Sequence, residues 1–97
     1  MPGDTSAVHL IITGRVQGVG YRAWCQGEAE ARGLSGWVRN RRDGSVEAVV
    51  RGGAQAVAEF VAACHEGPTF AKVTGVAQKS APADADLPQK FEQRPTA

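Results

Sequence analysis

The sequence predicts an α+β fold whose strands and helices follow the order β-α-β-β-α-β. Three observations lead to this fold: an alternating apolar run over residues 8–13, a pair of alternating runs joined by Asp43-Gly44, and two stretches with helical spacing of apolar residues. This order is that of the split βαβ or ferredoxin-like sandwich, an antiparallel sheet with two helices on one face. The first two strands then run parallel, with the third strand between them.

The length and composition fit one small domain. The chain has 97 residues, of which 42% are hydrophobic, and its net charge is +1. We predict a disordered lead-in over residues 1–7 and a single domain over residues 8–97. The small net charge indicates no broad attraction to nucleic acid, and no apolar run is long enough to span a membrane. Nothing resembles a signal peptide, so we expect a cytoplasmic protein.

The first part of the chain predicts a strand, a glycine-rich connection and a helix. Residues 8–13 alternate, and Ile11 makes both faces partly apolar, which is typical of a central strand. Residues 22–32 favour a helix that ends at Gly33. A spacing of four residues places one apolar stripe on its inner face, consisting of Tyr21, Cys25 and Ala29.

The middle of the chain predicts a hairpin followed by the most regular helix. Residues 34–41 and 45–51 are the two strands, and Asp43-Gly44 favours a tight turn because both positions tolerate a positive φ. Residues 54–66 form the second helix, which Gly67-Pro68 ends. Its inner stripe follows the i, i+3, i+4, i+7 spacing and consists of Val57, Phe60, Val61 and Cys64.

The C-terminal third is less regular. Residues 71–79 predict a strand in which Val73 and Val76 break strict alternation, a pattern compatible with a β-bulge. Residues 80–90 predict a loop, because proline, aspartate and alanine dominate them. Residues 91–94 predict a short last strand.

Neither the cysteines nor the histidines show metal-ligand spacing. Cys25 and Cys64 are far apart and form no CxxC motif, so we expect two reduced, partly buried thiols. Because the two helices would run antiparallel, both cysteines would share one end of the helical layer, and a disulfide between them stays an alternative. His9 and His65 stand alone, so no metal site is expected.

The segment from Gly14 to Arg22, GRVQGVGYR, is the strongest functional signal. Its three glycines let backbone N–H groups turn toward one point, and the following helix N-terminus adds partial positive charge. Arg22 adds a full charge and a planar fork of donors, a combination that suits a phosphate. The spacing matches neither the P-loop GxxxxGK[ST] nor the dinucleotide motif GxGxxG. On the glycines alone, a plain turn is an equal alternative.

The predicted topology brings a second polar residue to this segment. The carboxyl ends of the first and second strands lie at the same edge of the sheet. The segment leaves the first strand, and Asn40 sits at the end of the second. Two segments that are distant in sequence therefore converge, although an asparagine at a strand end is also common in simple turns.

Two motifs resemble those of a known family. GRVQGVGYR resembles the first signature of the acylphosphatase family, GxVQGVxFR. GWVRNRRDGSV at residues 36–46, with Gly52 beyond it, resembles the second, in which G-aromatic-V-x-N precedes GxV. The resemblance covers residues 8–76. The chain departs from the pattern at Tyr21, where the family usually has phenylalanine, and the tail at residues 91–94 is a faint match to the last strand of the family.

The resemblance implies hydrolysis of acyl phosphates to a carboxylate and inorganic phosphate, with no cofactor and no metal. Arg22 would clamp the phosphoryl group, and Asn40 would orient the attacking water. Backbone N–H groups would cradle the phosphoryl oxygens in a segment made of Val16, Gln17, Gly18, Val19, Gly20 and Tyr21. Apart from the resemblance, the basic cluster of Arg39, Arg41 and Arg42 is either a solvated hairpin end or a patch that adds diffuse attraction for the dianion.

The expected partner is therefore a small-molecule acyl phosphate, with no nucleic acid and no membrane. A monomer is the default in the family that the chain resembles. Carbamoyl phosphate, 1,3-bisphosphoglycerate and acetyl phosphate would all fit a site that reads mainly the phosphoryl group. The alternative from another class is a non-catalytic anion-binding or RNA-binding ferredoxin-like module, since open faces of such sheets often bind RNA.

Overall fold

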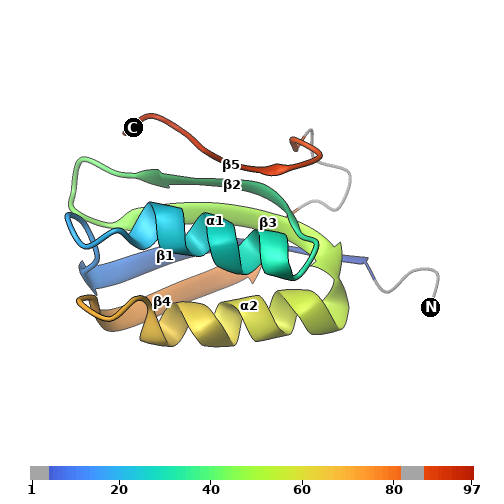
Figure 1. Ribbon diagram of the computed structural model, residues 1–97, viewed down its shortest axis with the longest axis horizontal. Coiled ribbons are helices and arrows are strands. Elements are labelled where there is room, and N and C mark those ends of the chain that lie inside the picture. The colour runs from blue at the N-terminus through green and yellow to red at the C-terminus, as the bar shows by residue number, and fades with distance from the viewer. Residues whose placement is uncertain (1–4, 82–86) are drawn as a thin grey trace.

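The computed structural model describes residues 5–81 and 87–97. Within them, five strands form one sheet, and both helices cover the same face of it (Figure 1). The predicted α+β, ferredoxin-like order is confirmed. The elements are β1 (Thr5–Arg15), α1 (Tyr21–Ala31), β2 (Ser35–Asn40), β3 (Val46–Gly53), α2 (Ala54–Glu66), β4 (Lys72–Ser80) and β5 (Phe91–Gln93).

The sheet has the strand order β4-β1-β3-β2-β5. As predicted, β3 lies between β1 and β2 and is antiparallel to both, so β1 and β2 run in the same direction. The four longer strands pair antiparallel as predicted, and β5 adds a parallel pairing with β2, with Val38 opposite Gln93, so the sheet is mixed. β4 and β5 lie at opposite edges of the sheet, and β5 runs in the direction of its neighbour β2 (Figure 1).

The N-terminal strand is longer than predicted. Residues 5–7 belong to β1, where Ala7 pairs with Arg51 and is only 6% exposed. The predicted lead-in over residues 1–7 is therefore wrong for these three positions, and residues 1–4 lie outside the described residues. The pattern failed here because threonine, serine and alanine carry little apolar signal, although the long β3 offers them a partner. Of the predicted loop over residues 80–90, Ser80 belongs to β4, and residues 82–86 lie outside the described residues.

A β-bulge shapes the end of β1, as the broken alternation of the fourth strand indicated. The register between β1 and β4 shifts between Thr13 and Gly14. Gly14 has a φ of 116°, and a Cβ at this position would overlap the carbonyl oxygen of Lys72. Only glycine therefore fits the point at which β1 leaves the sheet and enters the glycine-rich connection.

The predicted hairpin joins β2 and β3, but its turn differs in detail from the expected one. Only Gly44 has a positive φ, of 95°. Asp43 instead accepts hydrogen bonds from the Ser45 hydroxyl at 2.6 Å and the Ser45 amide at 2.9 Å. These bonds lower the pKa of Asp43 and fix the turn through the side chain, as is common for aspartate.

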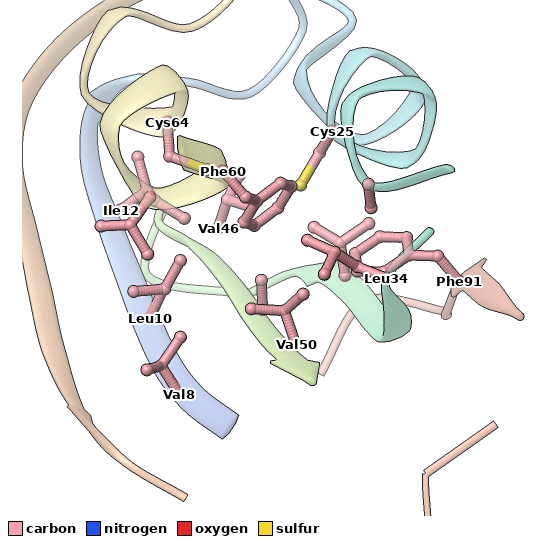
Figure 2. Close-up of a cluster of buried hydrophobic side chains, with 14 of the residues drawn as sticks. Val8, Leu10, Ile12, Cys25, Leu34, Val46, Val50, Phe60, Cys64 and Phe91 are labelled. Atoms are coloured by element: carbon pink, nitrogen blue, oxygen red, sulfur yellow. The ribbon is translucent and has the colours of Figure 1, made fainter. Parts of the chain in front are cut away.

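The core lies between the helices and the sheet (Figure 2). Both predicted inner stripes are buried there. Cys25 and Cys64 are completely buried and free, as expected, rather than joined in a disulfide. A hydrogen bond with the Cys64 thiol, together with burial, raises the pKa of Cys25. Phe91, only 2% exposed, packs with its ring 6.1 Å from that of Phe60 and anchors β5 to the core.

Candidate active site

A pocket of about 170 Å³ lies where the β1–α1 connection meets the end of β2. Figure 1 shows these segments at the same end of the sheet. The convergence inferred from topology is therefore present, because Arg22 and Asn40 line the same pocket. The described residues that line it are Val16, Gln17, Gly18, Gly20, Tyr21, Arg22, Ala23, Asn40 and Gln93.

Left-handed glycines form the backbone of the connection. Gly18 and Gly20 have φ values of 74° and 79°, which few other residues adopt without strain. Gly20 is the N-cap of α1, and no side chain of the described residues caps this helix. The N–H groups of the first turn therefore stay available for an anion. Val19 does not line the pocket, since its side chain packs against the core.

The two side chains expected to act, Arg22 and Asn40, line the pocket and have no hydrogen-bond or ion-pair partner among the described residues. Arg22 and Asn40 are both half-buried. Within the described part of the chain, neither the Arg22 guanidinium nor the Asn40 amide makes a hydrogen bond or ion pair. The Asn40 carbonyl is held separately, by a 3.0 Å hydrogen bond from the Ala97 amide. Both functional groups are therefore free to bind a ligand.

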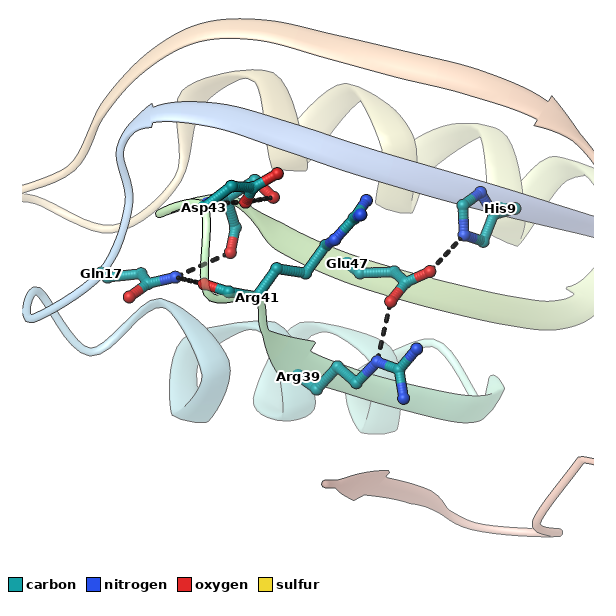
Figure 3. A network of polar contacts seen from close by, with 7 residues as sticks. His9, Gln17, Arg39, Arg41, Asp43 and Glu47 are labelled. Atoms are coloured by element: carbon teal, nitrogen blue, oxygen red, sulfur yellow. Dashed lines mark hydrogen bonds and ion pairs between the residues drawn. The ribbon is translucent and has the colours of Figure 1, made fainter. Parts of the chain in front are cut away.

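Gln17 links the glycine-rich connection to the β2–β3 hairpin. Its Nε2 donates to the carbonyl oxygens of Arg41 at 2.7 Å and of Ser45 at 2.8 Å (Figure 3). Both partners can only accept, which fixes the amide orientation. The sequence predicted only a backbone role for Gln17, because nothing local reveals a contact that spans more than 20 residues.

Gln93 is a pocket residue that the sequence did not indicate. It comes from β5, and its Nε2 donates to Gln26 Oε1 at 2.8 Å. Alternation from the buried Phe91 would have placed Gln93 on the helix-bearing face. Its nearness to Asn40 depends on the parallel pairing of β5 with β2, for which the sequence carried no signal.

The neighbouring arginines do not all face the pocket. Arg39 Nε bonds to Glu47 Oε1 at 2.7 Å, and His9 Nε2 lies 2.7 Å from Glu47 Oε2 (Figure 3). The Arg39 guanidinium also stacks 4.7 Å from the ring centre of Trp37. Arg39 is thus held on the open sheet face. Burial raises the pKa of Glu47, but the hydrogen bonds from His9 and Arg39 and the charge of Arg39 outweigh burial and lower it overall.

Residues 5–81 and 87–97 contain neither a cluster of metal ligands nor a membrane-spanning helix. Nowhere in these ranges do three or more His, Cys, Asp or Glu side chains gather in a way that would hold a metal ion. His65 is exposed on α2. No helix in these ranges is long and apolar enough to cross a membrane.

The fold and the pocket define a small α+β protein with a pocket at one end of its sheet, where Arg22 and Asn40 meet the glycine-rich connection. The sequence profile of the acylphosphatase family matches residues 8–93. The chain belongs to the acylphosphatase family and is an enzyme of that family.

Individual relatives agree with this membership. An acylphosphatase of Azorhizobium caulinodans is 57% identical over 79 residues, which are 81% of this chain and 85% of the relative. One from Nitrobacter hamburgensis is 50% identical and covers 96% of this chain and 98% of its own. The crystal structure of acylphosphatase from Bacillus subtilis superposes with a TM-score of 0.86 at 39% identity, covering 91% of this chain and 97% of that one.

Proposed function

We propose that this protein hydrolyses acyl phosphates to a carboxylate and inorganic phosphate in the pocket at the end of β1. The observation that carries the proposal is that Arg22 and Asn40, both without protein partners among the described residues, line one pocket with the glycine-rich backbone. Membership of the acylphosphatase family supports the reaction class. The residue roles below are our assignment.

The phosphoryl group binds to the cradle of residues 16–21 and to Arg22. The uncapped start of α1 offers N–H donors, and the left-handed Gly18 and Gly20 turn the backbone toward the ligand. Arg22 adds a bidentate, permanently charged donor. Because phosphoryl transfer depends mainly on positioning and charge neutralisation, these groups supply most of what the protein must provide.

Asn40 orients the attacking water. Its side-chain oxygen accepts a hydrogen bond from the water, which then faces the phosphorus opposite the leaving carboxylate. The new bond joins the water oxygen to phosphorus, and the bond between phosphorus and the acyl oxygen breaks, leaving its electron pair on the carboxylate. Asparagine is no base at neutral pH, so the water proton passes to a phosphoryl oxygen.

The pocket size bears on substrate range. About 170 Å³ accommodates the phosphoryl group and its water, while the acyl group projects outward. We therefore infer that acyl phosphates with different acyl groups are hydrolysed. A carboxylate is already a good leaving group, so the reaction needs no metal to activate it.

The decisive experiment follows benzoyl phosphate hydrolysis with and without a chelator. We expect turnover that the chelator leaves unchanged and that inorganic phosphate inhibits competitively. Phosphate binding without any hydrolysis would instead favour the non-catalytic anion-binding module. A gel shift with single-stranded RNA at moderate salt tests the RNA-binding alternative, for which we expect no shift.

A further inference from the structure

We propose that the Gln17 side chain is a positioning residue that sets the distance between the phosphate cradle and Asn40. The inference rests on the proposed function, because it concerns how two parts of that site are held together. It adds a role for the side chain, whereas the proposed function uses only the backbone of Gln17.

The contacts place Gln17 at the mouth of the hairpin. The carbonyl of Arg41 also accepts the Gly44 amide at 3.1 Å, and that of Ser45 also accepts the Arg41 amide at 2.8 Å. Gln17 adds a second donor to each carbonyl, at 2.7 and 2.8 Å. One side-chain amide therefore spans both ends of the turn that directly follows Asn40.

Among the described residues, no other hydrogen bond joins residues 16–20 of the glycine-rich connection to this turn. The hairpin is also held by the C-terminal residue of the chain. The Ala97 amide donates to the Asn40 carbonyl, and the Ala97 carbonyl accepts a hydrogen bond from the Arg42 amide. β3 lies between β1 and β2, and its backbone pairing with these strands ends at Ile12–Val46 and at Asn40–Val46. Gln17 thus joins the two segments beyond the last paired residues (Figure 3). Gln17 and Asn40 both line the pocket.

This bridge matters more for turnover than for phosphate binding. The cradle and Arg22 lie within one continuous segment, so phosphate contacts do not depend on the hairpin. The attacking water, in contrast, is held by Asn40 on β2, and it must lie in line with a phosphorus that the cradle holds. A displacement of about 1 Å at such a centre costs roughly 100-fold in rate.

The test is the variant Gln17→Leu, which keeps much of the volume and removes both donors. We expect kcat for benzoyl phosphate to fall by about 10–100-fold. The inhibition constant of inorganic phosphate should change by less than about 3-fold, since its contacts are elsewhere. The matched control is Gln55→Leu, because Gln55 is an exposed glutamine whose amide reaches only Glu59. This control should behave as wild type.

A double-mutant cycle separates positioning from general damage. In an Asn40→Ala background, Gln17→Leu should cost almost nothing further in kcat, because the group it positions is gone. Additive losses, or equal losses in kcat and phosphate affinity, would overturn the inference. If Asn40→Ala alone turns over like wild type, the role assigned to Asn40 is wrong, and the inference fails with it. If the wild-type protein does not hydrolyse benzoyl phosphate at all, the proposed function is wrong instead, so the two failures are distinguishable.

Gln17→Glu provides a second readout that does not depend on Gln17→Leu folding well. A carboxylate facing two carbonyl oxygens repels them, whereas a protonated carboxyl can donate to one. The kcat of Gln17→Glu relative to wild type should therefore rise at least several-fold as the pH falls toward 4.5. A constant ratio across this range would contradict a role for the donor.

Discussion

The hydroxyl of Tyr21, the first residue of α1, donates a 2.7 Å hydrogen bond to the carbonyl oxygen of Cys64 in the last turn of α2. In a continuing helix this carbonyl would accept the amide of residue 68, but Pro68 has no N–H. Burial raises the pKa of Tyr21 far above its usual range, so the hydroxyl stays a donor. Tyr21 stands where the acylphosphatase family usually has phenylalanine. Its hydroxyl thus gives the Cys64 carbonyl a hydrogen-bond donor that phenylalanine could not supply.

Tyr21→Phe should lower stability without affecting the chemistry. It leaves the buried Cys64 carbonyl without its donor, which costs about 1–3 kcal/mol in the free energy of unfolding. The backbone amide at position 21 is unchanged, so kcat and phosphate inhibition should match wild type. Urea denaturation measures the first effect, and benzoyl phosphate hydrolysis the second. A variant as stable as wild type would mean that another group satisfies this carbonyl.

Local patterning predicted most of the fold. The bounds predicted for the second helix, 54–66, coincide with those of α2, since its apolar spacing is regular and Gly67-Pro68 ends it. The hairpin and the bulge were likewise readable from residues close in sequence. The site prediction combined this topology with the motif resemblance, and both Arg22 and Asn40 do line one pocket.

The features that the sequence did not predict all involve contacts between segments distant in sequence. Nothing in Phe91-Glu92-Gln93 indicates that it pairs in parallel with β2, and so nothing placed Gln93 at the pocket. The contact from Gln17 to the hairpin is of the same kind. The weakly apolar residues 5–7 became a strand only because β3 extends far enough to pair with them.

Glu47→Gln should weaken the fold in a pH-dependent manner. The Glu47 carboxylate, 12% exposed, holds both His9 and Arg39, and its pKa is lowered overall. A lowered pKa in the folded state adds stability above the ordinary value near 4.5, and that stability is lost as the pH falls through the lowered value. We expect a loss of about 1–3 kcal/mol at pH 7 that shrinks toward zero in acid. Urea denaturation across pH measures it, and a pH-independent difference would contradict it.

Arg22→Ala should abolish phosphate binding and nearly all turnover, because Arg22 is the one positively charged side chain among the described residues that line the pocket. Arg22→Lys keeps the charge but loses the bidentate geometry, so it should bind phosphate more weakly than wild type and better than alanine. Thermal unfolding with added phosphate ranks the three proteins, since a ligand raises Tm only if it binds the folded state. Equal phosphate-dependent shifts in all three would place the anion elsewhere.

Asn40→Ala should separate chemistry from binding. We expect kcat to fall by about 100–1000-fold, as for loss of one positioned polar group, while the phosphate inhibition constant stays near that of wild type. Asn40→Asp has nearly the same shape but places a negative charge beside the dianion, so it should lose phosphate affinity as well as turnover. Steady-state kinetics with benzoyl phosphate, combined with phosphate inhibition, distinguishes the two variants. If Asn40→Ala instead lost affinity and turnover equally, Asn40 would bind the phosphoryl group rather than the water.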